Sequence, residues 1–373
     1  MTRNVHLVGA LPGDSPQEAL DLAYSMVGPY LRSVPDGETG ERRKWVIAIF
    51  DMMRNHPDVI AAKDYGGTYD PAVDLGQADP AEAAGKNWSD FDHIPRLKLR
   101  RWWHRPDPAQ IRTGIVESSR SGYPVFAKAR AEHGNPQQRF QIGFPGDFDM
   151  SLCSFGPQTV IAKPSFRRAI VRDITAVRRE LGDDVVFQIE IPWQVLPVSM
   201  APRPLRGSVA WYFARAMRSL VTRCPDGTNF GVHLCLGDMH HRSVVRLKDL
   251  GPVVTFTNEI VRHWPASHPL VYVHLPLAHG EEPPATSPAF YQPLRQLHIP
   301  AHVRVAAGFV HELRSEEEQR KLLAMLEDLA GRQLDVANSC GLGRQRKELA
   351  VYNLKQAAAL AGERRHDGSD ASR

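Results

Sequence analysis

The chain has few cysteines, little net charge and no long hydrophobic run. Its 373 residues include only four cysteines, which are too few for a disulfide scaffold. Its apolar runs all fall short of the roughly 18 residues that cross a bilayer. The first 25 residues include His6, Asp14 and Glu18, which interrupt any signal-peptide core. We therefore expect a cytoplasmic protein with no membrane partner.

The net charge of +4 is small for this length and gives no general electrostatic case for binding nucleic acid. One basic stretch, Arg96–Arg105, contains two tryptophans and has the composition of a nucleic-acid patch. Because the chain is not basic elsewhere, we predict that this stretch is a solvated edge or a strand packed on the main fold. We expect no nucleic-acid partner.

What the chain does contain is a rhythm of short β-rich runs that alternate with helical patterns. Such alternation predicts βα units and a parallel sheet. We count eight strands, centred near residues 5, 32, 141, 188, 232, 272, 305 and 336. Eight βα units are the requirement of a TIM (β/α)8 barrel, whose functional site lies at the carboxyl ends of the strands.

The barrel is expected to span residues 1–361 as a single domain. Residues 56–135 are rich in Pro, Gly, Asp and Ala and break the βα rhythm. We predict that they form an irregular insertion after the second βα unit, which caps one end of the barrel. The polar tail, residues 362–373, is predicted to be disordered.

The most informative pattern is His233 and Cys235, two residues apart in an apolar run. In a strand, such positions point to the same face. Cys340 ends another apolar run and is followed by Gly341, which lets the backbone turn tightly. If the two strands meet in a barrel, an imidazole and two thiolates converge. Three such ligands suit Zn²⁺ and leave one coordination position open for a substrate.

His274 ends the predicted sixth strand and is the candidate fourth ligand. A hydrogen-bond role behind a metal ligand is the alternative for this side chain. Glu259 or a water molecule could complete the shell instead.

Acid–base chemistry is suggested by His311, at the end of the seventh strand, and Glu190, at the end of the fourth. A carboxylate beside an imidazole on one rim can fix the ring and raise its pKa. A structural ion pair is the alternative.

Two acidic loops are candidates for substrate binding. Asp36 and Glu38 lie in a glycine-rich loop after the second strand, which lacks the Gly-Lys-Ser/Thr of a phosphate loop. This loop could hold a substrate amine. Asp147 is similarly placed after the third strand. Turn formation and helix capping are the alternatives for these acids.

These residues together resemble the carboxyl-terminal catalytic barrel of cobalamin-independent methionine synthase. The wider superfamily also holds uroporphyrinogen decarboxylase and epoxyalkane:coenzyme M transferase. The matching pieces are Val8–Pro12, Gln188–Pro192, the His233-x-Cys235 strand, His311 and Asn338–Leu342. The resemblance implies zinc held by His233, Cys235, Cys340 and one further ligand, and a thiol activated for attack on an alkyl donor. It also implies that His311 protonates the leaving group, with Glu190 as its partner.

The chain departs from that family in three places. His274 stands where the synthase has a Glu ligand, Gly9-Ala10 stands where it has Gly-Ser, and the synthase's amino-terminal half-molecule has no counterpart. We therefore expect a different thiol, a different alkyl donor, or both.

The predicted function is a zinc-dependent transfer of an alkyl group, most simply methyl, involving a small thiol. Two alternatives stay open. One is a metal-independent lyase or decarboxylase that uses Glu190 and His311. The other is a non-catalytic protein that binds zinc or a thiol.

Overall fold

The structure is a computed structural model that describes residues 3–61, 97–133, 135–239, 242–243 and 245–362. Residues 62–96 of the predicted insertion and the predicted tail beyond residue 362 lie outside the described residues.

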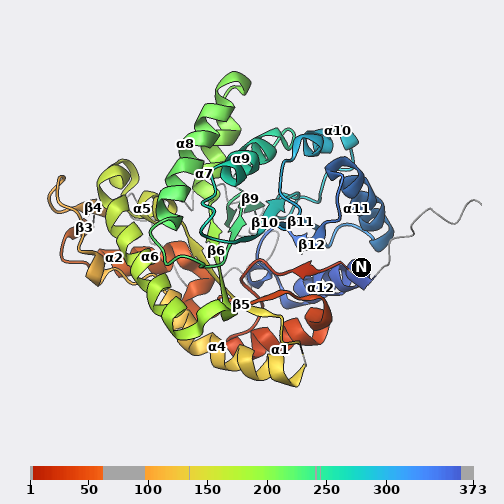
Figure 1. The fold of residues 1–373 in the computed structure, drawn as a ribbon, viewed down its shortest axis with the longest axis horizontal. Helices are drawn as coiled ribbons and strands as arrows, with labels where there is room; N and C mark the ends of the chain where they lie inside the picture. Colours follow the sequence, from red (N-terminus) through yellow and green to blue (C-terminus); the bar gives the residue numbers. More distant parts are fainter. Residues whose placement is uncertain (1–2, 62–96, 134, 240–241, 244, 363–373) are drawn as a thin grey trace, which may run out of the picture.

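A parallel eight-stranded sheet forms the centre of the molecule (Figure 1). Its strands follow the order β1, β12, β11, β10, β7, β6, β5, β2. β1 and β2 are the two ends of this order. A parallel bridge between Val5 of β1 and Leu31, two residues before β2, joins them and closes the ring. The strands are β1 (Val5–His6), β2 (Ser33–Pro35), β5 (Arg139–Pro145), β6 (Val185–Glu190), β7 (Phe230–His233), β10 (Leu270–Pro276), β11 (Arg304–Val310) and β12 (Asp335–Asn338). The predicted (β/α)8 barrel is confirmed, and each of the eight predicted strand centres falls on or beside an observed strand.

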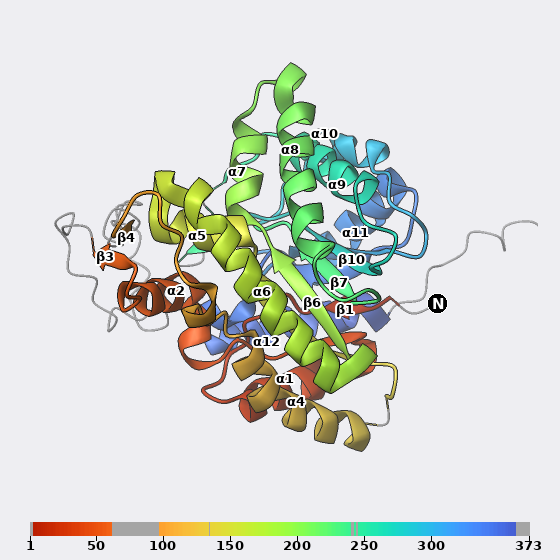
Figure 2. The same ribbon diagram turned by 60° about the vertical axis from the view of Figure 1, so that its left-hand side comes forward.

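Helices cover the outside of this ring (Figures 1 and 2). They are α1 (Pro16–Val27), α4 (Ile115–Glu132), α6 (Thr159–Leu181), α8 (Arg203–Val221), α9 (Gly251–Arg262), α11 (Glu316–Ala330) and α12 (Lys347–Gly362). Four further helices, α2 (Trp45–Arg54), α5 (Asp147–Phe155), α7 (Pro192–Met200) and α10 (Pro288–Tyr291), lie in the connections that follow strands. None of the helices described is long and apolar enough to cross a membrane.

Local capping explains where two of the outer helices begin. The Ser15 side chain accepts a hydrogen bond from the Glu18 backbone N–H at the start of α1. Ser315 and Glu318 form a reciprocal capping box at the start of α11. Both satisfy backbone donors that a helix leaves unpaired at its first turn.

Part of the predicted insertion is regular. Helix α4 is 18 residues long and packs against α1, α6 and β5, as the barrel helix that follows β2. Pro124 and Gly122 inside it weaken its helical signal in the sequence. Packing compensates, because a Cβ at Gly122 would lie only 2.8 Å from the Phe140 ring. The short antiparallel strands β3 (Val59–Ala61) and β4 (Leu97–Leu99) place part of the basic stretch on a strand.

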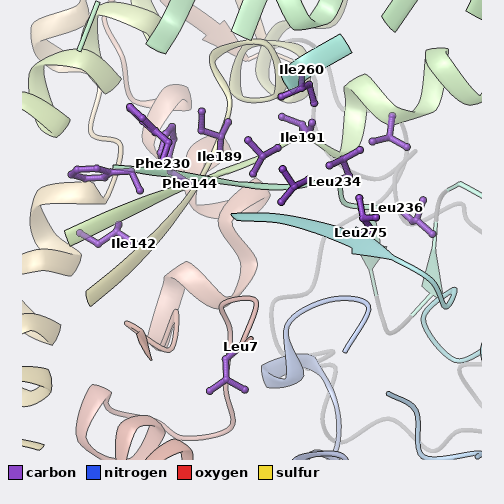
Figure 3. Packing of buried hydrophobic residues seen from close by; sticks show 14 of the residues in the cluster. Leu7, Ile142, Phe144, Ile189, Ile191, Phe230, Leu234, Leu236, Ile260 and Leu275 are labelled. Carbon is purple, nitrogen blue, oxygen red and sulfur yellow. The ribbon is translucent and has the colours of Figure 1, made fainter. Parts of the chain in front are cut away.

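Alternation along the strands separates the apolar shell from the polar lumen. In β6, Phe187 and Ile189 pack in the main hydrophobic cluster, whereas Gln188 and Glu190, which alternate with them in sequence, form polar contacts in the barrel. Figure 3 shows the apolar set, including Ile142, Ile189 and Leu234. Because side chains alternate across a strand, burying one set against the helices turns the other toward the lumen.

Candidate metal centre

Three potential metal ligands converge at the carboxyl ends of β7 and β12. His233 is the last residue of β7, Cys235 follows two residues later, and Cys340 lies two residues beyond β12. The two Sγ atoms are 3.8 Å apart, and Cys340 Sγ is 3.8 Å from His233 Nε2. All three ligand atoms lie within 4.8 Å of one another. The predicted convergence of these three side chains is therefore present in the structure.

The spacing fits a tetrahedral zinc ion. With Zn–S bonds of about 2.3 Å and Zn–N bonds of about 2.0–2.1 Å, tetrahedral geometry requires S–S and S–N separations of about 3.8 and 3.6 Å. The Sγ–Sγ separation of 3.8 Å equals the first value, and the Cys340 Sγ to His233 Nε2 separation of 3.8 Å lies close to the second. Cys235 Sγ and the His233 ring nitrogen lie within 4.8 Å of each other. Neither cysteine forms a disulfide, so both thiols can act as ligands.

Glycines bring the Cys340 loop against the first strand-end loop. Gly343 donates its N–H to the Ala10 carbonyl over 2.8 Å. A Cβ at Gly343 would lie 2.9 Å from the Leu11 carbonyl oxygen, and one at Gly341 would lie 3.0 Å from the Ala10 nitrogen. These close approaches fix the loop that carries Cys340.

Each thiol also has a donor beside it. The Gly237 N–H lies 3.3 Å from Cys235 Sγ, and Arg344 Nη2 lies 3.3 Å from Cys340 Sγ. Donors of this kind stabilise the thiolate form, which is the metal ligand.

His274 does not take the place predicted for it as fourth ligand. Its Nδ1 lies 2.7 Å from His233 Nδ1, and its Nε2 lies 2.9 Å from the Asn338 carbonyl oxygen. Both ring nitrogens are therefore engaged away from the two thiols. These contacts correspond to a hydrogen-bond role behind a metal ligand, which was the alternative to ligation for His274. Burial lowers the pKa of His274 to about 4 and lowers the pKa of His233 below its usual range. Both rings are thus neutral at physiological pH.

Glu259, the other protein candidate for the fourth position, lies on helix α9. Its carboxylate pairs with Arg262 on the same helix at 3.0 Å and with His263, the residue that caps the end of that helix, at 3.4 Å. Among the described residues, the only His, Cys, Asp or Glu groups close enough together to hold a metal are His233, Cys235 and Cys340.

Glu38 and Glu190 form a buried pair of carboxyl groups, close enough to Arg344 to feel its charge. A Cβ at Gly143 would be 2.8 Å from an Oε1 atom of each residue, so only glycine leaves room for both. Burial raises the pKa of both carboxyls, and the Glu190 charge raises that of Glu38 further. Burial therefore disfavours the ionised form of both carboxyls, and each carboxylate opposes the ionisation of the other.

The groups around the pair favour the ionised form of Glu190 over that of Glu38. Glu190 accepts a hydrogen bond from Gln188 Nε2 at 3.1 Å, and the nearby Arg344 charge also favours its ionised form. Glu38 is the one non-glycine residue with a positive φ, +45°, within the described ranges. Strained backbone of this kind often accompanies a functional side chain.

Asp36 and Asp147, predicted to bind substrate, have ionic partners within the chain. Asp36 forms short contacts with Arg42 and Ser118. Asp147 accepts a 2.6 Å hydrogen bond from Arg167. The substrate-binding roles of Asp36 and Asp147 stay predictions. Asp36 accepts the Glu38 backbone N–H at 3.3 Å, and the Glu38 carboxyl itself lies close to Glu190.

His311 is 2% exposed at the end of β11. Its Nε2 lies 2.9 Å from the Gly280 carbonyl oxygen, and its Nδ1 accepts the Leu313 N–H at 3.1 Å. Glu190 has Glu38 and Gln188 as its neighbours. The pairing of His311 with Glu190 stays a prediction.

Sequence reasoning missed Gln188 and Arg344. Gln188 donates to Glu190 and accepts the Tyr272 hydroxyl at 3.1 Å, so it links the carboxyl pair to the lumen. The signal available in the sequence was the alternation of polar and apolar residues in Gln188-Ile189-Glu190, which places Gln188 on the same face of the strand as Glu190. Arg344 follows Cys340 by four residues, but only the folded loop brings its guanidinium back to that thiol.

Comparisons with known proteins show a likeness of structure. No family model and no curated protein match the sequence. The structure of a B12-independent methionine synthase from Shewanella sp. W3-18-1, in complex with selenomethionine, matches with a TM-score of 0.54 at 13% identity. That match covers 97% of each chain. A methyltransferase from Methanosarcina mazei matches with a TM-score of 0.47 at 11% identity, over 96% of this chain and 93% of the other. The chain thus shares the α/β-barrel fold of a B12-independent methionine synthase structure over nearly its whole length.

Proposed function

We propose that this protein is a zinc-dependent enzyme that transfers an alkyl group, most simply methyl, to a small thiol. The observation that carries the proposal is the convergence of His233 Nε2, Cys235 Sγ and Cys340 Sγ at the carboxyl ends of the barrel strands. The functional sites of such barrels lie at that end. The fold shared with a methionine synthase supports the same chemistry.

The residues present fit zinc as three ligands with one position left for a substrate. Zinc bound there would supply activation of the substrate thiol, because coordination favours the thiolate form of a group whose free pKa is about 8.5. The protein's own task is then to orient the alkyl donor and the thiol and to supply a proton to the leaving group.

The carboxyl pair is the proposed anchor for the rest of the thiol substrate. Glu38 and Glu190 lie together in a buried place, and the ionised form of Glu190 would present a negative charge there. A substrate ammonium group would pair with that charge. The selenomethionine in the Shewanella structure is an amino acid, which agrees with such an anchor.

His311 is the proposed proton donor to the leaving group. Because its Nδ1 accepts the Leu313 N–H, the neutral ring carries its proton on Nε2. The Gly280 carbonyl now accepts from that nitrogen, and it would hold the ring in place until a leaving group competes for the proton.

The first test is elemental analysis of the purified protein and of Cys235→Ser, with Cys224→Ser as the matched control. Cys224 is a buried cysteine whose thiol faces the Leu220 carbonyl on α8. We expect about one zinc per chain in the wild type and in the control, and loss of zinc in Cys235→Ser. A panel of aminothiols with methyl donors then tests transfer.

Two results would overturn the proposal. Wild-type protein purified without chelators that holds no zinc would exclude the metal centre. Zinc-free protein that retains full turnover in a lyase or decarboxylase assay would instead support the metal-independent alternative built on Glu190 and His311.

A further inference from the structure

The His274 side chain lies between His233, a candidate metal ligand, and Asn338 at the end of β12. It lies on β10 beside His233 on β7, in direct parallel register. Its side chain is fully buried. One ring nitrogen faces His233 and the other faces the backbone of Asn338, the last residue of β12. The ring therefore bridges the two strands that deliver His233 and Cys340.

The hydrogen-bond partners assign the positions of the ring protons. A carbonyl oxygen can only accept, so His274 Nε2 carries a proton and donates it to Asn338. In the neutral ring, Nδ1 then has only a lone pair. His233 must therefore donate from its own Nδ1 across the 2.7 Å contact. That assignment leaves the lone pair of His233 on Nε2, the nitrogen that faces Cys340.

We propose that His274 is a positioning residue that fixes the tautomer and orientation of His233, and that the metal centre has three protein ligands. This inference rests on the zinc site of the proposed function and adds the reason why His233 presents Nε2 to it. A histidine ligand that donates its other N–H to a fixed acceptor is held in orientation and made more basic.

Gly308 on β11 makes this arrangement sterically possible. A Cβ at that position would lie 2.8 Å from His274 Nε2 and 2.9 Å from the Asn338 carbonyl oxygen. These are the two atoms of the hydrogen bond that anchors His274. Substitution of Gly308 therefore disturbs the bridge without altering any candidate ligand.

The consequence for chemistry is an uncommitted fourth coordination position. His274 cannot bind the metal and bridge His233 to Asn338 at once, because the bridge uses both of its ring nitrogens. With two thiolates and a neutral imidazole, the charge of a zinc centre would be balanced before substrate binds. The fourth position is then available to a substrate thiolate, and Arg344 at 3.3 Å from Cys340 offsets the charge that this thiolate adds.

The test compares zinc affinity, measured by chelator competition, in four variants of the full-length protein. His274→Leu removes the acceptor for His233, and His274→Asn restores an acceptor near the position of Nδ1. Gly308→Ala displaces the bridge indirectly. His268→Leu is the matched control, because His268 is also buried and hydrogen-bonded through both nitrogens, to Ser267 and the Cys224 carbonyl. Thermal unfolding of each variant separates loss of folding from loss of affinity.

We expect His274→Leu and Gly308→Ala to bind zinc roughly 10–100-fold more weakly, as is typical when a ligand's hydrogen-bond partner is removed. His274→Asn should recover most of the affinity, and His268→Leu should bind like the wild type. With Co²⁺ in place of zinc, the thiolate-to-metal absorption should persist in His274→Leu at saturating metal, because both cysteines remain.

Three results would overturn the inference. His274→Leu with wild-type affinity would show that the bridge does not position His233. Complete loss of metal from His274→Leu, as in Cys235→Ser, would make His274 a direct ligand. Wild-type protein that binds no zinc would remove the centre itself. If the affinities follow the expected order but no thiol is alkylated, the proposed function fails and this inference stands.

Discussion

Acidic side chains at the two ends of the barrel have opposite pKa shifts, as Glu38 and Glu190 at the carboxyl end and Asp184 at the amino end show. At the carboxyl end, Glu38 and Glu190 are buried together, and burial raises the pKa of both. At the amino end, Asp184 just precedes β6 and is held by two hydrogen bonds of 2.7 Å from Arg130. The Arg130 hydrogen bonds lower the pKa of Asp184.

The Glu38–Glu190 pair and Asp184 therefore differ in how their charge is balanced by neighbouring groups. Around the amino mouth, Arg304 pairs with the buried Asp335 at 2.7 Å, and the exposed Asp183 pairs with Arg178 at 2.6 Å. Such pairs serve stability. The carboxyl end instead buries carboxyls, thiols and neutral imidazoles side by side, which costs stability and is typical of functional sites. Substitutions at each end of the barrel can test this division between a functional carboxyl end and a stabilising amino end.

Replacement of Cys340 by serine should abolish metal binding, because only His233 and Cys235 would remain as strong ligands. Zinc content should fall from about one per chain to near zero. Elemental analysis measures it, with Cys224→Ser as control. Stoichiometric zinc in Cys340→Ser would place the metal elsewhere.

Glu38→Gln should change the pH dependence of stability. Burial and the nearby Glu190 charge raise the folded-state pKa of Glu38 above its usual range, so folding is favoured at low pH and disfavoured as pH rises through the folded-state pKa. Removing the titration should therefore stabilise the protein above that pH, by about 1–3 kcal/mol.

Urea unfolding of wild type and Glu38→Gln between pH 5 and 8 checks this prediction, with exposed Glu180→Gln on α6 as control. Parallel stability curves for wild type and Glu38→Gln would show that the pair does not hold an extra proton. The same variant should raise the KM for an aminothiol more than it lowers kcat, because it removes charge from the proposed anchor.

Arg344→Gln should weaken zinc binding by up to roughly 10-fold, since a charged donor to Cys340 Sγ is lost. The matched control is Arg346→Gln, because Arg346 is an exposed arginine two residues away. Chelator competition measures the affinity. Equal affinities in the two variants would show that the Arg344 contact does not tune the centre.

Asp184→Asn at the amino end should have the smallest effect. The partly exposed pair with Arg130 is worth about 0.5–1 kcal/mol after solvent screening. Because the pKa of Asp184 is lowered, that stability is present above the unfolded-state pKa and is lost as pH falls. The pH slope is thus opposite in sign to that of Glu38. Zinc affinity should not change, and a loss of zinc would break the division between the two ends.

Much of the fold could be predicted because periodicity is a local property. The eight strands, and the capped starts of α1 and α11, follow from patterns within a few neighbouring residues. Helix α4 was missed as a barrel helix, because Pro124 and Gly122 mask its periodicity and its stability comes from packing on α1 and β5.

The candidate site was predictable in its residue types more than in its pairings. The sequence places Glu190, His274 and His311 near strand ends, since each closes an apolar run. It cannot say which side chain across the lumen each will meet. Glu190 lies beside Glu38 rather than in a demonstrated pair with His311, and His274 lies behind His233 rather than beside the thiols.

The sequence by itself determined the barrel, the face on which His233 and Cys235 lie, and the strand ends that carry the chemistry, because alternation and βα rhythm are encoded locally. Only the folded chain shows that His274 contacts His233, that Glu38 and Glu190 are buried together, and that Arg344 reaches Cys340. Those outcomes depend on contacts between strands and loops distant in sequence, where burial and a few tenths of an ångström decide which partner a polar group meets.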